Sequence, residues 1–185
     1  LMLSAAHCLW GRSCGNNHIV FDWAEGATDV IPAANVYRCV DVAYREYERT
    51  GGGEDLALIR LDRPVADRTP VTLSDRMPLV GEPLFMLGHP MGLPRKLVDE
   101  GTVLGHGPAA LSFRHDLDTF SGNSGGPIFN GDGELAGILV RSLSPNWVSI
   151  GRGCMGWGIA HEDDYAEGNT ILHLPGVRET GLYQK

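Results

Sequence analysis

The chain has 185 residues, of which 43% are hydrophobic, and it contains 25 glycines and 11 prolines. This length and composition are typical of one globular unit, or of two small ones, built from strands and turns. The formal net charge of −8 argues against nucleic acid as a partner, because phosphate binding needs a basic surface. No run of 18 apolar residues occurs, so we expect no membrane-spanning helix.

The first third of the chain predicts short strands separated by glycine. Residues 19–21 and 36–40 are rich in β-branched and aromatic side chains, which favour strands. A flexible triple-glycine loop at 51–53 leads into residues 56–61, which partly alternate in the manner of a half-buried strand. The proline-containing segment 62–76 is interpreted as the crossing to a second unit.

The second part of the chain carries clearer turn signals. Residues 83–88 and 96–104 predict two strands, with Gly101 at a bulge in the second of them. The Asn-Gly-Asp-Gly stretch at 130–133 lies between two apolar runs, at 128–129 and 135–140. That pattern is a strong signal for a β-hairpin.

The stretch Gly-Asn-Ser-Gly-Gly-Pro at 122–127 is the most informative motif of the chain, and the other motifs can be interpreted as supporting its serine. A serine hydroxyl has too high a pKa to attack a carbonyl group unaided, so Ser124 needs a neighbouring base and a site for the developing oxyanion. Glycines allow a tight turn in which the N–H groups of Gly122 and Ser124 point at one spot. Two further motifs supply the missing chemistry: Ser-Ala-Ala-His-Cys at 4–8 and Glu-Asp-Leu-Ala-Leu-Ile-Arg-Leu at 54–61.

These three motifs, in the order His7, Asp55, Ser124, resemble the trypsin/chymotrypsin superfamily of serine proteases. The intervals also fit, with 48 positions from His7 to Asp55 and 69 from Asp55 to Ser124. Leu-Gly-His-Pro-Met-Gly-Leu-Pro at 87–94 and Leu-Asp-Thr-Phe-Ser at 117–121 are similar to the bacterial trypsin-like branch, which includes glutamyl endopeptidases and HtrA-type proteases.

The resemblance implies an all-β fold of two Greek-key β-barrels with the active site at their seam. Residues 1–68 would form the remainder of the first barrel and residues 69–185 the second, with a short helix after Pro175. In the family, strands of the first barrel precede the histidine, which here is residue 7. We therefore expect the first barrel to lack its N-terminal strands in this chain, and a longer precursor or another segment to supply them.

The resemblance also assigns the chemistry of the site. His7 would be the general base and then the general acid, Asp55 would orient its ring, and Ser124 would be the nucleophile. The N–H groups of Gly122 and Ser124 would form the oxyanion hole. Glu54 is the alternative carboxylate, but only Asp55 matches the motif, and the other six histidines are interpreted as structural or solvated.

Substrate preference rests on the loop before the nucleophile. In the family, the residue six positions before the serine lies at the bottom of the primary pocket, which here is Asp118, next to Thr119. A buried carboxylate there would favour Arg or Lys before the cut, whereas the alternative is that Asp118 braces the turn. Relatives specific for glutamate use a histidine where this chain has Leu139, which argues against that preference.

The strand after the hairpin supplies the other substrate contacts. Val140, Arg141 and Ser142 are expected to pair with the substrate backbone as an added β-strand. Arg141 is either a residue at the rim of the pocket or a solvated charge. The acidic residues 162–164, with Glu167, lack the alternating spacing of a calcium loop and are interpreted as a solvated surface.

The sequence thus predicts a serine endopeptidase that acts through an acyl-enzyme on polypeptide substrates, with no cofactor and no metal. A protein inhibitor or the missing N-terminal segment are the other expected partners. Two alternatives stay open: a catalytically silent protease-like module that binds or regulates, and an esterase with the same triad. The four cysteines, at 8, 14, 39 and 154, allow three pairings, with a disulfide expected in or near 8–39 if the protein is secreted or periplasmic.

Overall fold

The structure, a computed structural model, describes residues 1–9, 14–26, 30–48, 53–108, 111–143, 147–157 and 164–172. Within these ranges the regular elements are β-strands and four 3-10 helices of three or four residues, with no α-helix. The expected all-β class is therefore observed. The helix expected after Pro175, and residues 162 and 163 of the acidic segment, lie outside the described residues.

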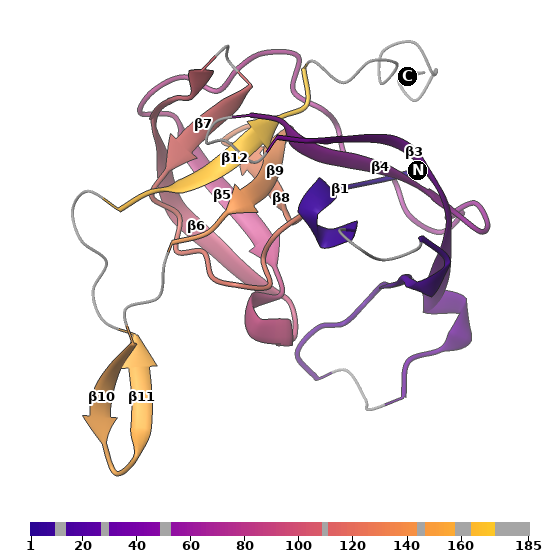
Figure 1. Cartoon of the computed structure of the whole chain (residues 1–185), viewed down its shortest axis with the longest axis horizontal. Coiled ribbons are helices and arrows are strands. Elements are labelled where there is room, and N and C mark those ends of the chain that lie inside the picture. Colours follow the sequence, from indigo (N-terminus) through magenta and orange to yellow (C-terminus); the bar gives the residue numbers. More distant parts are fainter. Residues whose placement is uncertain are drawn as a thin grey trace.

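The first part of the chain forms a four-stranded antiparallel sheet with the order β1-β4-β3-β2. Its strands are β1 (Met2–Ser4), β2 (His18–Val20), β3 (Val36–Tyr47) and β4 (Asp55–Leu61). The sheet curves but does not close into a barrel, and β4 and β3 are its two central strands (Figure 1). Strands were expected in all three predicted segments, but β3 continues well beyond residue 40.

The second part is a closed six-stranded barrel with the order β12-β7-β6-β5-β8-β9. Its strands are β5 (Pro83–Gly88), β6 (Lys96–His106), β7 (Ser112–His115), β8 (Pro127–Asn130), β9 (Leu135–Arg141) and β12 (Ala166–Thr170). The strand predicted at 83–88 has those bounds, and the predicted hairpin is β8–β9. The pairing of β5 with β6 shifts register next to Gly101, as predicted for a bulge there.

A separate hairpin of β10 (Trp147–Gly151) and β11 (Cys154–Trp157) projects away from the barrel (Figure 1). Within the described parts of the chain, each helix is far too short to reach across a bilayer.

Strand β4 joins the two halves because it is buried on both faces. Side chains alternate along a strand, so Ala57, Ile59 and Leu61 pack into the core of the first sheet. Leu56 faces the other way and joins a seam cluster with residues of β8 and β9. The members of this seam cluster are Leu56, Phe129, Leu135, Ile138 and Ile171. Asp55, the first residue of β4, therefore lies where the sheet meets the barrel.

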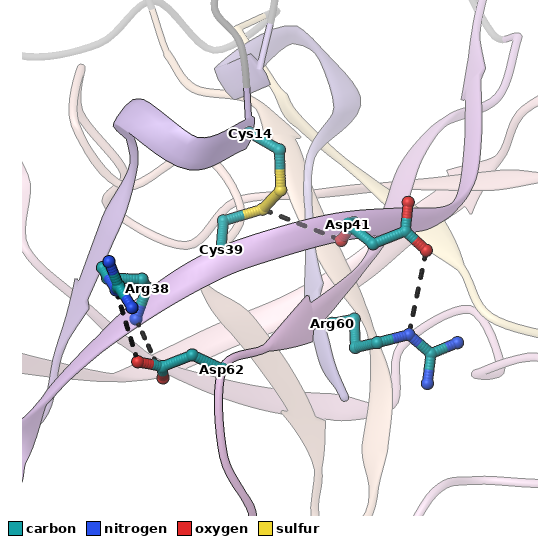
Figure 2. Close-up of a disulfide and its surroundings, with 6 residues drawn as sticks. All are labelled: Cys14, Arg38, Cys39, Asp41, Arg60 and Asp62. Carbon is teal, nitrogen blue, oxygen red and sulfur yellow. Dashed lines mark hydrogen bonds and ion pairs between the residues drawn. A yellow bond between two sulfur atoms is a disulfide. The ribbon is translucent and has the colours of Figure 1, made fainter.

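One disulfide, between Cys14 and Cys39, ties the 3-10 helix Cys14–Asn16 to β3 (Figure 2). It closes a loop with a sequence separation of 25, which in the chain-entropy view stabilises the fold by about 3 kcal/mol. Ion pairs from Arg38 to Asp62 and from Arg60 to Asp41 flank it (Figure 2). The other two cysteines, at positions 8 and 154, are free and exposed.

Candidate active site

The histidine motif lies in a tight turn between β1 and the interior of the first sheet. His7 is the second residue of a 3-10 helix, Ala6–Leu9. Ala5 and Ala6 are fully buried, and Ala6 packs into the core of the first sheet. The ring of His7 keeps 31% of its side-chain surface exposed, so it is open to a substrate.

Asp55 holds His7 through both of its carboxylate oxygens. Oδ2 accepts a hydrogen bond from Nδ1 of the ring at 2.6 Å, and Oδ1 accepts the backbone N–H of His7 at 2.9 Å. A carboxylate only accepts hydrogen bonds, so in the neutral form of the ring the proton resides on Nδ1 and the lone pair on Nε2. The pair therefore presents a basic nitrogen on the side of the ring away from Asp55.

The same contact sets the charge of the ring. The hydrogen bond to the Asp55 carboxylate, with a smaller contribution from the Cys8 thiol, raises the pKa of His7 from 6.5 to about 10. Burial of the ring acts in the opposite direction and is outweighed. Asp55 thus favours the imidazolium form that a general base passes through during catalysis.

The turn that carries Ser124 depends on glycine at two positions. Gly122 has φ +97° and Gly125 has φ +81°, conformations that side chains with a Cβ rarely adopt. A Cβ on Gly122 would lie 2.7 Å from the backbone nitrogen of Met91, and one on Gly125 would lie 2.5 Å from Oγ of Ser4. The turn is therefore packed against the β5–β6 loop on one side and the histidine segment on the other.

Two backbone N–H groups of this turn are left without an acceptor among the described residues. The N–H groups of Asn123, Gly125 and Gly126 are bonded to the carbonyls of residues 120, 139 and 123, respectively. Those of Gly122 and Ser124 make no such bond in the described structure. Unpaired neighbouring donors of this kind are the requirement for an oxyanion hole.

The serine turn and the histidine lie next to each other across the seam. The thiol of Cys8, the residue after His7, lies 3.7 Å from the carbonyl oxygen of Ser124. Within the described residues, the Ser124 hydroxyl and the ring of His7 are not joined by a hydrogen bond. Catalytic hydrogen bonds are often long in the free enzyme and tighten when substrate binds.

The predicted substrate residues lie in two segments, the loop before Ser124 and the end of β9. Asp118 is exposed, not buried as the resemblance implied, and lines a cavity of about 150 Å³ together with Lys96 and Asn123. Thr119 is fully buried. The two specificity residues therefore differ in their access to solvent although they are adjacent in sequence.

The end of β9 carries the other predicted substrate contacts. Val140 and Ser142 are half-buried and Arg141 is exposed. Arg141 lies 3.7 Å from the carboxylate of the buried Glu167, which also accepts a hydrogen bond from the hydroxyl of Ser112 at 2.9 Å. Arg141 is thus anchored by an ion pair through its guanidinium group rather than only solvated.

The structure buries three polar residues in the barrel: Asn169, which the sequence did not single out, His115, which was interpreted only as structural or solvated, and Glu167, whose interpretation as part of a solvated surface is wrong because it is 6% exposed. Glu167 supports Arg141, and Asn169 is fully buried beside Asp55. His115 is fully buried, with no partner for either ring nitrogen among the described residues. None of them belongs to a motif. Within the same residues, no group of three or more metal-binding side chains is gathered.

An open sheet and a closed barrel that meet at a His–Asp pair, beside a glycine-rich serine turn, define the class of trypsin-type serine proteases. Residues 1–138 match the family described as trypsin-like peptidase domain. The chain therefore belongs to the trypsin-like peptidase domain family.

Curated relatives are proteases that are much longer than the matched segment. The chain is 35% identical over 107 residues to the periplasmic serine endoprotease DegP of Salmonella typhimurium, covering 54% of this chain and 22% of DegP. It is 31% identical over 111 residues to the chloroplastic Protease Do-like 1 of Arabidopsis thaliana, covering 54% of this chain and 25% of that protein. The match thus spans a quarter or less of these relatives.

Solved structures share the fold. The scabies mite inactivated protease paralogue S-I1 superposes with a TM-score of 0.69 at 18% identity, covering 99% of this chain and 84% of that chain. The Rv3671c protease from M. tuberculosis, in its active form, gives a TM-score of 0.51 at 16% identity, covering 91% and 63%. These likenesses confirm the trypsin-like two-barrel fold that the sequence predicted.

Proposed function

We propose that this chain is the catalytic domain of a serine endopeptidase that cleaves peptide bonds through an acyl-enzyme. The observation that carries the proposal is the 2.6 Å hydrogen bond between His7 Nδ1 and Asp55 Oδ2, beside a serine turn with two unpaired N–H groups. Ser124 is the nucleophile, His7 the base, and Asp55 the group that orients and stabilises the ring.

The reaction follows from these positions. Oγ of Ser124 attacks the carbonyl carbon of the substrate and gives its proton to Nε2 of His7, while the N–H groups of Gly122 and Ser124 bind the oxyanion. The C–N bond then breaks as His7 returns the proton to the leaving amine. Water attacks the acyl-enzyme by the same route and restores the free serine. A positioned base contributes about 10²–10⁴ in rate and an oxyanion donor about 10²–10³, so all parts must be assembled together.

We further propose that an extended polypeptide adds to the end of β9 at Val140, Arg141 and Ser142 by backbone hydrogen bonds. A protein inhibitor with an extended segment would pair with the same end of β9. A preference for Arg or Lys before the cut rests on Asp118, six residues before the nucleophile, whose exposed carboxylate can meet a substrate side chain. Thr119, its neighbour, is fully buried and would support the loop that carries Asp118 rather than contact the substrate.

An exported location, secreted or periplasmic, is part of the same proposal. The DegP relative of Salmonella typhimurium is periplasmic, and the Cys14–Cys39 disulfide is a bond that persists in oxidising compartments.

The deciding experiment is labelling with a fluorophosphonate probe, which reacts only with an activated serine. The wild-type chain and the Ser121→Ala variant should be labelled, because Ser121 is an exposed neighbour in the same loop. The Ser124→Ala variant should lose labelling completely, a loss of at least about 10³-fold given the size of the base and oxyanion contributions. Labelling is read by in-gel fluorescence and mass spectrometry of the modified peptide.

Absence of labelling in both wild type and Ser121→Ala would overturn the proposal that the chain is an enzyme, and would favour the catalytically silent binding module. If the wild-type chain reacts with the probe, hydrolysis of esters but not of peptides by the untreated protein would favour the esterase. A peptide library with Arg, Lys, Glu or aromatic residues before the cut, repeated with Asp118→Ala, then tests the basic preference.

A further inference from the structure

Asn169 is a polar side chain buried at the point where the barrel meets the first sheet. It lies in β12, is 0% exposed, and belongs to none of the motifs of the family resemblance. Its backbone carbonyl packs so closely against β9 that a Cβ on Gly137 would overlap it. A fully buried amide must find hydrogen-bond partners, and the ones it finds are informative.

Within the described structure, its side chain makes three hydrogen bonds, and all three reach other segments of the chain. Oδ1 accepts the backbone N–H of Asp55 at 2.8 Å. Nδ2 donates to the carbonyl of Gly53 at 3.3 Å and to that of Leu111 at 3.2 Å. Because Nδ2 faces two carbonyls and Oδ1 faces an N–H, only one orientation of the amide satisfies them.

The amide therefore fastens the start of β4 to the barrel. Gly53 and Asp55 flank Glu54, so two backbone groups of the segment that carries the carboxylate are held by one side chain of β12. Asp55 in turn holds His7 through both oxygens. Ser124 belongs to the barrel, so the two halves of the triad are carried by different parts of the molecule.

We propose that Asn169 is a positioning residue, which keeps the Asp55–His7 pair in register with Ser124 across the seam. The inference rests on the proposed function. Asn169 touches neither substrate nor the reacting atoms, and it acts through the backbone of Asp55. A displacement of about 1 Å in a catalytic group can cost about 10²-fold in rate, so loss of this tie should lower kcat far more than it changes KM.

Three variants test the proposal. Asn169→Ala removes all three bonds and should lower kcat by about 10- to 100-fold, with KM within about twofold. Asn169→Asp keeps the oxygen that accepts the Asp55 N–H but loses donors, so its kcat should lie between those of Asn169→Ala and wild type. Thr170→Val is the matched control: it removes a hydroxyl bond to the same Leu111 carbonyl, 3.4 Å long, without touching Asp55, and should leave kcat unchanged.

Each kcat is divided by the folded fraction, measured by circular dichroism at the assay temperature. The pH profile of kcat/KM adds a readout that a purely structural role would not move. A loosened Asp55–His7 contact should shift the acid limb to lower pH in Asn169→Ala and not in Thr170→Val. If Asn169→Ala does not fold, Asn169→Asp and Thr170→Val carry the same comparison, with kcat lowered only in the first.

Equal kcat and equal pH profiles for the Asn169 and Thr170 variants, in an active wild type, would overturn the positioning role alone. A wild type that neither reacts with the fluorophosphonate probe nor hydrolyses peptides would overturn the proposed function, and the positioning role with it.

Discussion

The pKa of a histidine is shifted in opposite directions in two regions of the molecule: the seam between sheet and barrel, and the interior of the barrel. At the seam, His7 is partly exposed and bonded to a carboxylate, which raises its pKa to about 10. Inside the barrel, burial lowers the pKa of His115 to about 4. Asp116 opposes that shift only weakly, and neither ring nitrogen has a partner among the described residues.

The difference comes from neighbours rather than from the residue type. His115 faces Val103 and Ala166 across the strand pairs and lies 6.0 Å from the ring of Phe113, so its charged form would have no compensation. His7 has lost solvent as well, but a carboxylate at 2.6 Å outweighs the loss. The seam therefore supports a proton carrier, whereas the barrel interior keeps its histidine neutral.

The largest expected effect comes from removing the charge of the Asp55 carboxylate, which His7 has as a partner and His115 lacks. In Asp55→Asn the new amide can donate to Nδ1 of His7, which places the ring proton on Nε2 and blocks its role as a base. We expect kcat to fall by about 10⁴-fold, the loss that the general triad template gives for this change. Steady-state kinetics on a peptide substrate measures it.

Glu54→Gln is the matched control for that variant. Glu54 is the adjacent carboxylate, and it accepts a hydrogen bond from the hydroxyl of Tyr44 at 2.7 Å instead of contacting His7. Its kcat should stay within a few-fold of wild type. A comparable loss in both variants would show that Asp55 has no special part in the site.

A smaller effect is expected on the pH dependence of kcat/KM. Only neutral His7 can accept the proton of Ser124, so kcat/KM should rise about tenfold per pH unit below the raised pKa of about 10. The stabilisation from the protonated pair has the opposite sign: it is fully present below 6.5 and is lost as pH rises through the folded-state pKa. An acid limb of kcat/KM centred at or below 6.5 would contradict this assignment.

The motif residues could be predicted because each lies in a segment with strong local rules. The Asn-Gly-Asp-Gly turn at 130–133 specifies its hairpin, and the glycines around Ser124 specify a turn that other residues cannot adopt. The run after Asp55 becomes β4 at nearly the expected bounds, although the strand is buried on both faces and not half-buried as expected. Local chemistry thus predicts where these elements lie, but not how deeply β4 is buried.

The residues that support the site could not be found in this way. Strand β12 has the sequence Ala-Glu-Gly-Asn-Thr, which contains poor strand formers and gives no alternation. It is a strand because β7 and β9 pair with it on both sides in a closed barrel. The contact of Asn169 with Asp55 spans 114 positions, and the burial of His115 depends on the same barrel closure. The disulfide partner of Cys14 was likewise left open, because pairing is decided in three dimensions.

The smallest expected effect is on the free energy of unfolding, and it comes from the buried His115. Between pH 6.5 and about 4 the unfolded chain binds a proton at His115 that the folded chain does not, so stability should fall as pH falls, by about 3 kcal/mol over that window. His115→Leu removes the titrating group and two unsatisfied nitrogens while keeping an apolar side chain in the core. We expect the variant to match or exceed wild type in urea unfolding at pH 7 and to exceed it clearly at pH 4.5.

The exposed His18 provides the comparison that isolates burial as the cause. His18→Leu removes a histidine from the edge strand β2, where its side chain is exposed, so this variant is the control for the loss of a histidine outside the core. If His115→Leu showed the same acid destabilisation as wild type, the neutral buried histidine would not be its source. If it removed the destabilisation and left kcat unchanged, the two histidines would be shown to act independently, one on catalysis and one on the fold.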